Sequence, residues 1–243
     1  MTIVGAGRMA RGLATRALAG GHQVRLVDRS RAKAAELAGE LRRHAGHQPG
    51  EVRRCDAIAV TDADLVILAV PYPRGRDLAA DYGTALTGSV LVDVSDPAGS
   101  PGEPEPCRPR EDLGTGAARA GVPGSPGGRG APVAAAVPEG ISAAEQIAAE
   151  APPGAPVVKA FSTNSADTLL TGRDAGRPLD VLIAGDDEDA KRAVAHLAAS
   201  GGLRPLDVGP LRRARELEGL RLRHRTVPQR PGFGPFGAVT DLS

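Results

Sequence analysis

Aromatic residues are nearly absent from this chain of 243 residues, which has three Phe, two Tyr and no Trp. Proteins that hold single-stranded nucleic acid stack the bases on aromatic side chains, so this composition argues against that role. The 30 Lys and Arg residues nearly balance the 29 Asp and Glu residues, and the net charge of +1 points to no particular partner. We therefore expect no nucleic acid among the partners of this protein.

Cysteine is scarce, and long apolar runs are missing. Cys55 and Cys107 lie far apart in the sequence, with no metal-ligand spacing. This favours reduced thiols in a cytosolic protein, with a disulfide between them as the alternative. No apolar run reaches the ~18 residues of a membrane helix, and no signal-peptide pattern opens the chain. We expect a soluble, cytoplasmic protein without a membrane partner.

A catalytic or metal-binding arrangement is also missing. The five histidines are scattered along the chain, and neither a Ser-His-Asp arrangement nor a metal-ligand spacing is present. We therefore predict no catalytic side chain and no metal.

The first 28 residues carry the most informative pattern. A β-branched run is followed by the turn Gly5-Ala-Gly7, a helical run over residues 9–19 and a second strand that ends at Asp28. Gly5 permits a tight turn, Gly7 lets the backbone approach a pyrophosphate, and Ala10 stands where the helix packs closely on the strand. Asp28 lies where an adenosine ribose is held. The pattern predicts dinucleotide binding, with a plain strand-to-helix turn as the alternative.

Alternating strands and helices predict the fold class. Residues 65–70 are a continuous apolar run, as expected of a strand buried on both faces of a parallel sheet, and residues 89–94 fit another buried strand. Helices are predicted over residues 31–43 and 77–86, and a short strand over residues 57–60. We predict an α/β fold with a Rossmann-type doubly wound parallel sheet and a smaller C-terminal α/β domain.

The second half of the chain repeats this alternation after a Gly/Pro-rich stretch. Helices are predicted over residues 142–150, 187–199 and 210–220, and strands over residues 156–161, 181–184 and 203–208. The predicted domains are residues 1–97 for NAD(P) binding, 98–132 as a flexible insertion, 133–220 as the smaller substrate-side domain and 221–243 as an irregular tail.

Several segments resemble the NADPH-dependent coenzyme F420 reductases, a family related to the dinucleotide domain of the STEAP-type metalloreductases. They are Gly5-Ala-Gly-Arg-Met9, Asp64-Leu-Val-Ile-Leu-Ala-Val-Pro-Tyr72, Val92-Asp-Val-Ser-Asp-Pro97, Val157-Val-Lys-Ala-Phe-Ser-Thr163, Val181-Leu-Ile-Ala-Gly-Asp-Asp187 and the segment from Leu206 through Glu218. The last two are the most specific, because generic Rossmann domains lack them.

The resemblance implies that hydride passes between the nicotinamide C4 of NADP(H) and C5 of coenzyme F420, a deazaflavin co-substrate. It also implies a homodimer, since family members are commonly dimers. In such a reaction the protein orients two reactive molecules and needs no nucleophile of its own. Two alternatives stay open: a reductase of the same fold that acts on a carbonyl or imine compound, and a non-catalytic dinucleotide sensor.

Motif and resemblance together select the site residues. The predicted cofactor-binding residues are Gly5, Gly7, Arg8, Met9, Ala10, Asp28, Arg29, Ser30, Val70, Pro71 and Tyr72. The predicted substrate residues are Ser95, Asp96, Pro97, Ser162 and Thr163.

The sequence departs from the family where the second strand ends. The family has Gly-Ser-Arg there, whereas this chain has Val-Asp28-Arg29, followed by Ser30. Asp28 favours the free ribose hydroxyl of NAD, because a carboxylate ~4 Å from a phosphate repels it by ~1 to 4 kcal/mol. Arg29 favours the 2′-phosphate of NADP. Ser30 and the family resemblance favour NADP, with NAD as the alternative.

Further departures bear on the hydride acceptor. Asp96 replaces the Asn of the family's Asn-Pro, and Ser162 replaces the Asn of its Phe-Asn-Thr. Lys159 is either a proton donor or, by our preferred interpretation, a strand-end lysine that faces solvent or a carboxylate. Similarly, Arg212, Arg213 and Arg215 either bind an anionic deazaflavin tail or, by preference, form a solvated helix face.

Overall fold

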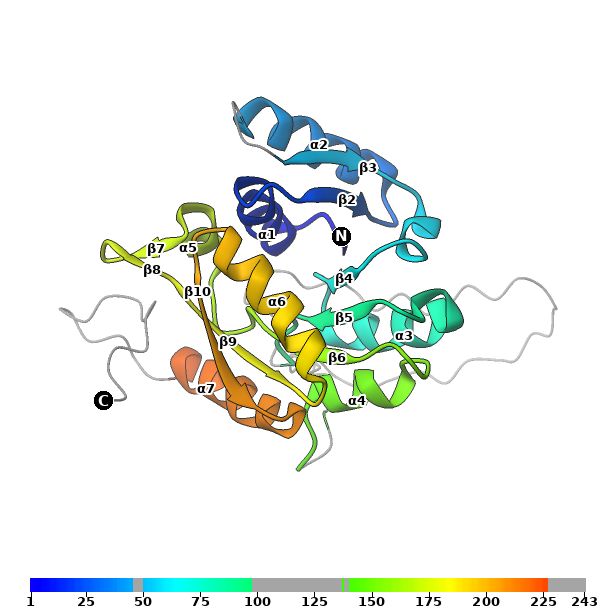
Figure 1. Ribbon diagram of the computed structural model, residues 1–243, viewed down its shortest axis with the longest axis vertical. Helices are drawn as coiled ribbons and strands as arrows, with labels where there is room; N and C mark the ends of the chain where they lie inside the picture. Colours follow the sequence, from blue (N-terminus) through cyan, green and yellow to red (C-terminus); the bar gives the residue numbers. More distant parts are fainter. Residues whose placement is uncertain (46–49, 98–136, 138–139, 227–243) are drawn as a thin grey trace, which may run out of the picture.

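An eight-stranded sheet forms the centre of the computed structural model, which describes residues 1–45, 50–97, 137 and 140–226 (Figure 1). Its strands are β1 (Thr2–Val4), β2 (Gln23–Val27), β3 (Glu51–Arg54), β4 (Leu65–Leu68), β5 (Val90–Asp93), β6 (Val157–Lys159), β9 (Asp180–Gly185) and β10 (Arg204–Gly209). They lie in the order β10-β9-β6-β5-β4-β1-β2-β3. All neighbours are parallel except β6 and β9, which are antiparallel. The mostly parallel Rossmann-type sheet is thus confirmed, and strands from residues 133–220 extend the same sheet.

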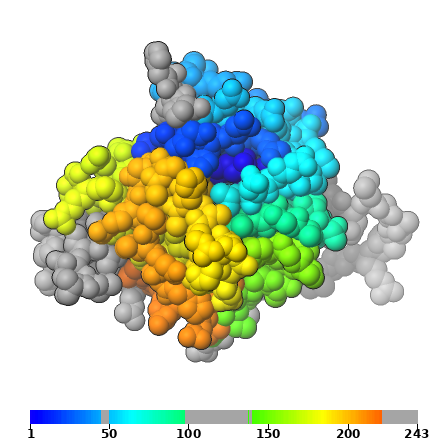
Figure 2. All heavy atoms as spheres, viewed as in Figure 1, coloured from blue at the N-terminus to red at the C-terminus, as the bar shows by residue number. Residues whose placement is uncertain are grey.

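Helices cover both faces of this sheet. One face carries α1 (Arg8–Ala19), α2 (Arg31–Ala45), α5 (Ala166–Thr171) and α6 (Glu188–Ser200). The other carries α3 (Tyr72–Tyr82), α4 (Ala143–Glu150) and the start of α7 (Ala214–Thr226). A small hairpin of β7 (Arg173–Asp174) and β8 (Arg177–Pro178) lies apart from the sheet. Figure 2 shows the blue segment of α1 beside the yellow-orange segment of α6, and these two helices are in contact.

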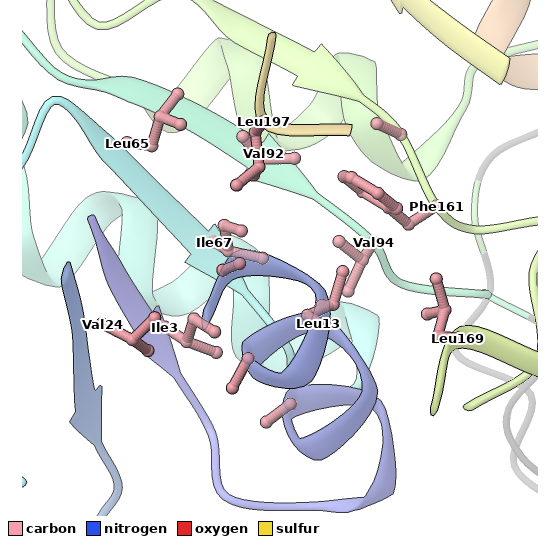
Figure 3. Packing of buried hydrophobic residues seen from close by; sticks show 14 of the residues in the cluster. Ile3, Leu13, Val24, Leu65, Ile67, Val92, Val94, Phe161, Leu169 and Leu197 are labelled. Carbon is pink, nitrogen blue, oxygen red and sulfur yellow. The ribbon is translucent and has the colours of Figure 1, made fainter. Parts of the chain in front are cut away.

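Neighbouring residues of a strand face opposite cores, as the pleat of a strand requires. Ile3 belongs to the core under α1, and Val4 belongs to the core under α3 and α4. On β4, Ile67 faces the first core and Val66 the second. Figure 3 shows Ile3, Ile67 and Leu13 together in the first core. The apolar run of β4 is therefore buried on both faces, as predicted.

The strand predicted over residues 57–60 is wrong. A 3-10 helix spans Ala57–Val60, and Ile58 within it is 74% exposed. Asp56 and Thr61, which favour turns, flank this segment and close it with short-range backbone bonds. The edge strand lies just before it, at β3, where Val52 alone is buried among charged residues.

The helix predicted over residues 77–86 begins and ends earlier in the structure, at Tyr72 and at Tyr82. α3 starts at Tyr72, and a 3-10 helix follows over Gly83–Leu86. Pro73 fits the first turn of a helix, where the missing N–H would have no partner anyway. At the other end of the chain, α7 continues to Thr226, past the predicted end at residue 220. The predicted insertion over residues 98–132, Cys107 and residues 227–243 lie outside the described part.

Candidate dinucleotide and substrate site

A tight loop joins β1 to α1, and its first glycine holds it against two strands. Gly5 has a φ of +115°, and a Cβ atom there would lie 2.4 Å from the carbonyl oxygen of Ala69, just after β4. The Gly5 N–H also donates to the carbonyl oxygen of Val27, at the end of β2, over 2.7 Å. Only glycine allows both the backbone angle and this close approach.

The second glycine leaves the start of α1 open. No side chain caps this helix at Gly7, and a Cβ atom at Gly7 would find no described atom within 4 Å. The first N–H groups of a helix have no partner within it, and the helix dipole gives this end a partial positive charge. An uncapped helix start beside open space fits the pyrophosphate of a dinucleotide.

Asp28 ties the end of β2 to this loop. Its Oδ2 accepts the backbone N–H of Ala6 over 2.9 Å, and its Oδ1 accepts the N–H of Ser30 over 2.8 Å. A carboxylate has about four acceptor positions, so lone pairs are left on Asp28 for a further donor. The acidic side chain therefore lies beside the glycine loop, as the motif requires.

Two predicted basic residues lie near the same loop. Arg8 starts α1, and its Nη2 lies 2.7 Å from an oxygen of Asp167 on α5. Both side chains are more than two-thirds exposed, so this ion pair contributes little and an anionic ligand can displace it. Arg29 is exposed directly after Asp28. The structure thus brings positive charge to the rim of the loop.

Three further predicted residues make structural contacts within the protein: Met9, Ala10 and Ser30. Ala10 is fully buried, and Met9 packs half-buried against the core. The Oγ of Ser30 accepts the backbone N–H of Lys33 over 3.3 Å in the first turn of α2. These contacts set the positions of α1 and α2 around the loop.

The predicted residues after β4 lead into α3. Val70 packs half-buried against the core, and Pro71 precedes the first turn of the helix. Tyr72 is 3% exposed, and its hydroxyl hydrogen-bonds Gln146 of α4. Burial raises the pKa of Tyr72 above its usual range. The tyrosine therefore joins α3 to α4 behind the rim, and its contact with a cofactor stays a prediction.

A buried ionic cluster lies where β5 and β6 end. Lys159 Nζ is 2.7 Å from Asp93 Oδ2, 2.8 Å from Glu218 Oε1 and 2.8 Å from the carbonyl oxygen of Ser95. The side chains of Lys159 and Asp93 are fully buried. Glu218 Oε2 accepts the backbone N–H of Ala143 at the start of α4 over 3.0 Å. The preferred interpretation of Lys159, a lysine facing a carboxylate, is thus confirmed.

The cluster keeps its lysine charged. Burial alone would lower the pKa of Lys159, but the charges of Asp93 and Glu218 outweigh it and raise that pKa. Burial raises the pKa of Glu218, against the opposing effect of Lys159. One positive charge is therefore held among two carboxyl groups inside the protein.

The predicted substrate residues follow neighbouring strands at one sheet edge. Ser95, Asp96 and Pro97 come after β5, and Ser162 and Thr163 come after β6. Between them, Phe161 is buried and has a φ of +60°, which L-residues rarely adopt. The carboxyl ends of parallel strands form the ligand edge of such sheets. The structure therefore brings both substrate segments to the same rim.

The arginines at the C-terminal end pair with acidic residues. Arg213 contacts Glu216 on α7 over 2.7 Å. Arg215 binds both carboxylate oxygens of Glu145 on α4. Glu145 also caps α4 together with Ser142 in a capping box. Arg215 thus contributes to helix packing, although like Arg212 and Arg213 it is exposed.

Sequence reasoning missed Asp93, Glu218 and Gln146 as partners in this region. A usable signal existed: a lone acidic residue and a lone lysine end the neighbouring apolar strands β5 and β6. Opposite charges at such positions have to meet, because buried charges are rarely left unpaired. Within the described residues we find no group of His, Cys, Asp and Glu that could hold a metal ion, and no described helix is long and apolar enough to cross a membrane.

Comparison with known proteins finds a family match over the N-terminal part of the chain. Residues 1–97 match the family model for coenzyme F420-dependent NADP oxidoreductases. The metalloreductase STEAP3 of Rattus norvegicus is 31% identical over 222 residues, which are 91% of this chain and 36% of that protein. The chain is thus similar to the F420-dependent NADP oxidoreductase family over its first 97 residues, and to STEAP3 over most of its own length. It spans about a third of the length of the rat protein.

Two solved structures share the fold of this chain over most of their length. A proposed F420-dependent NADP reductase from Arthrobacter sp. FB24 is 26% identical, with a TM-score of 0.63 over 92% of this chain and 90% of its own. A hypothetical protein from Sinorhizobium meliloti is 27% identical, with a TM-score of 0.61 over 86% of this chain and 84% of its own. The chain therefore has the fold of an NADP-dependent oxidoreductase.

Proposed function

We propose that this protein transfers hydride between NADP(H) and a deazaflavin of the F420 type. The observation that carries the nucleotide part is the uncapped start of α1 beside the open space at Gly7. The match of residues 1–97 to the family model of F420-dependent NADP oxidoreductases supports the F420 part.

The residues of the site would bind and orient two planar molecules. The first turn of α1 would hold the pyrophosphate, and the free lone pairs of Asp28 would accept a ribose hydroxyl. When bound, the reduced nicotinamide supplies the hydride, and the acceptor ring takes it up. The segments after β5 and β6 would enclose the reacting rings, because they lie at the ligand edge of the sheet.

Arg29 supports NADP as the preferred dinucleotide. It is exposed immediately after Asp28, and a guanidinium can hold a 2′-phosphate with two hydrogen bonds. Asp28 already accepts two backbone N–H groups, which partly offset its negative charge. The phosphate therefore meets less repulsion than an Asp28 carboxylate without these two hydrogen bonds would produce.

The first experiment titrates the full chain with NADPH and with NADH, and then follows F420 absorbance in the presence of NADPH. We expect tighter binding of NADPH and turnover of F420. Binding of NADPH without F420 turnover would overturn the acceptor assignment, and a panel of carbonyl and imine compounds would then distinguish another reductase from a sensor.

Paired variants test the nucleotide site itself. Gly7→Val fills the space at the start of α1 and should abolish NADPH binding. Because its Cβ meets no described atom within 4 Å, the ligand-free protein should keep nearly its usual stability. Gly39→Val on α2 is the matched control, since its Cβ would meet one arginine side chain at 3.5 Å, and it should bind NADPH normally. Unchanged affinity in Gly7→Val would refute the site.

The homodimer implied by the family stays a proposal. Light scattering of the purified chain would measure its mass in solution directly.

A further inference from the structure

The hydroxyl of Ser95 is buried, and among the described residues it has no hydrogen-bond partner. Ser95 as a whole is 5% exposed. Buried polar side chains in native proteins nearly always have a partner, because an unmatched one loses its bonds to water without replacement. This exception therefore needs an explanation.

A poorly fixed backbone at Ser95 does not explain why its hydroxyl has no partner. The N–H of Ser95 donates to Asp93 Oδ1 over 2.8 Å, and its carbonyl oxygen accepts from Lys159 Nζ over 2.8 Å. Both backbone polar groups of Ser95 are thus fixed by buried charged side chains, and the hydroxyl starts from a well-defined backbone position.

The charged neighbours do not hydrogen-bond the hydroxyl either. An ammonium group has three N–H donors, and three oxygens lie around Lys159, from Asp93, Glu218 and Ser95 itself. The two oxygens of Asp93 accept from Lys159 and from the Ser95 N–H, and neither they nor the Glu218 carboxylate are placed to hydrogen-bond the hydroxyl. As the described cluster is arranged, the Ser95 hydroxyl is left to a partner from elsewhere.

The position of Ser95 indicates what that partner is. The residue follows β5 at the carboxyl edge of the sheet, where ligands bind in doubly wound folds. β5 pairs with β4, which in turn pairs with β1 and its glycine loop. The hydroxyl thus belongs to the same edge as the start of α1.

We propose that the Ser95 hydroxyl binds the carbonyl or carboxamide group of a planar heterocyclic ligand. The carboxamide of nicotinamide and the ring carbonyls of a deazaflavin share this chemistry. The inference rests on the proposed function, because both ligands come from it, and it adds one defined contact to that site.

Two serine variants separate this contact from a structural role. Ser95→Ala removes a hydroxyl that has no partner in the ligand-free protein, so its melting temperature should stay within about one degree of wild type. Ser142→Ala removes a hydroxyl that caps α4, so it should melt several degrees lower and bind ligands normally. The two variants should therefore show opposite effects on stability and binding.

Titrations with two nucleotides, together with the KM for one acceptor, identify which ligand group Ser95 contacts. Isothermal titration with NADPH and with 2′-phospho-ADP-ribose, which lacks nicotinamide, is followed by the KM for F420. If Ser95 contacts nicotinamide, Ser95→Ala should weaken NADPH about tenfold and leave 2′-phospho-ADP-ribose unchanged. If it contacts the deazaflavin, only the KM for F420 should rise, by a similar factor.

Two results would overturn the inference. Ser95→Ala that matches wild type in both titrations and in KM would show that the hydroxyl meets no ligand. A variant that melts lower and binds both nucleotides equally more weakly would show a structural role instead. Wild-type protein that binds neither nucleotide would refute the proposed function itself, which distinguishes that failure from the other two.

Discussion

Lys159 Nζ lies 2.8 Å from Oε1 of Glu218, and this contact joins strand β6 to helix α7. The same ammonium group binds Asp93 at the end of β5 and the carbonyl oxygen of Ser95 beyond it. One buried lysine therefore connects the sheet, the C-terminal helix and the predicted substrate loop. A change in the charge of Lys159 should therefore affect the sheet, the C-terminal helix and the predicted substrate loop.

Replacing this lysine should destabilise the protein strongly. Lys159→Met keeps most of the side-chain volume but leaves two buried carboxyl groups without their cation. Breaking a buried ion pair in this way costs about 3–5 kcal/mol, because the remaining charge is uncompensated. Urea unfolding of the purified variant measures the loss.

Arg192→Met is the control for that loss. Arg192 pairs with Asp189 on α6, and both side chains are at least 70% exposed. Exposed pairs contribute about 0–1 kcal/mol, so the midpoint should hardly move. If Lys159→Met costs no more than this control, the ionic cluster does not exist as a buried unit in solution.

Acid should weaken the contact between α4 and α7. The hydrogen bonds from Arg215 lower the pKa of Glu145 to about 2, with help from Ser142 and against the effect of burial. Since this pKa lies below its usual value of 4.5, the ionised Glu145 stabilises the fold above that pH. The contribution is lost as the pH falls from 4.5 towards 2.

Glu145→Gln should remove this part of the pH dependence. Arg215 is 46% exposed, so we expect the free energy of unfolding at pH 7 to drop by about 1 kcal/mol or less. The difference between wild type and variant should vanish near pH 2. Glu216→Gln, which disturbs the exposed pair with Arg213, is the control. A difference that stays constant with pH would contradict the assignment.

The two glycines of the loop should respond differently to substitution. Gly5→Ala places a Cβ 2.4 Å from a backbone oxygen at a φ of +115°. Strain and overpacking together should cost about 2–4 kcal/mol in urea unfolding. Gly39→Ala in α2 should be neutral or stabilising, since alanine is the better helix former. Equal stability of Gly5→Ala and wild type would mean that the loop does not pack at Gly5 against the carbonyl oxygen of Ala69.

The sequence predicted best what depends on local pattern. The run of β4 is apolar throughout and that of β5 is apolar up to Asp93, and the loop of Gly5 and Gly7 has a fixed spacing. Both lie where they were expected. Short edge segments were harder: Val52 is the single buried residue of β3, and it gives no periodicity.

Long-range partners could not be predicted from such patterns. Glu218 looks like any acidic residue on the surface of a helix, and only the fold reveals that it meets Lys159. The reversed direction of β9 relative to β6 depends on the path of the chain between them, which hydrophobic pattern does not encode. The resemblance to the F420-dependent family supplies the acceptor hypothesis, and the residues alone do not name the acceptor.

Arg29→Ala tests the choice between the two dinucleotides. If Arg29 holds the 2′-phosphate, the variant should lose roughly 10- to 100-fold in NADPH affinity, the range expected for a hydrogen bond to a charged group. NADH lacks this phosphate, so its affinity should change less than about threefold. Arg31→Ala is the matched control: Arg31 is 76% exposed, begins α2 and pairs with Asp56. Fluorescence titration of wild type and both variants with both nucleotides measures the six affinities. An equal loss for NADPH and NADH in Arg29→Ala would mean that Asp28, and not Arg29, determines the preference.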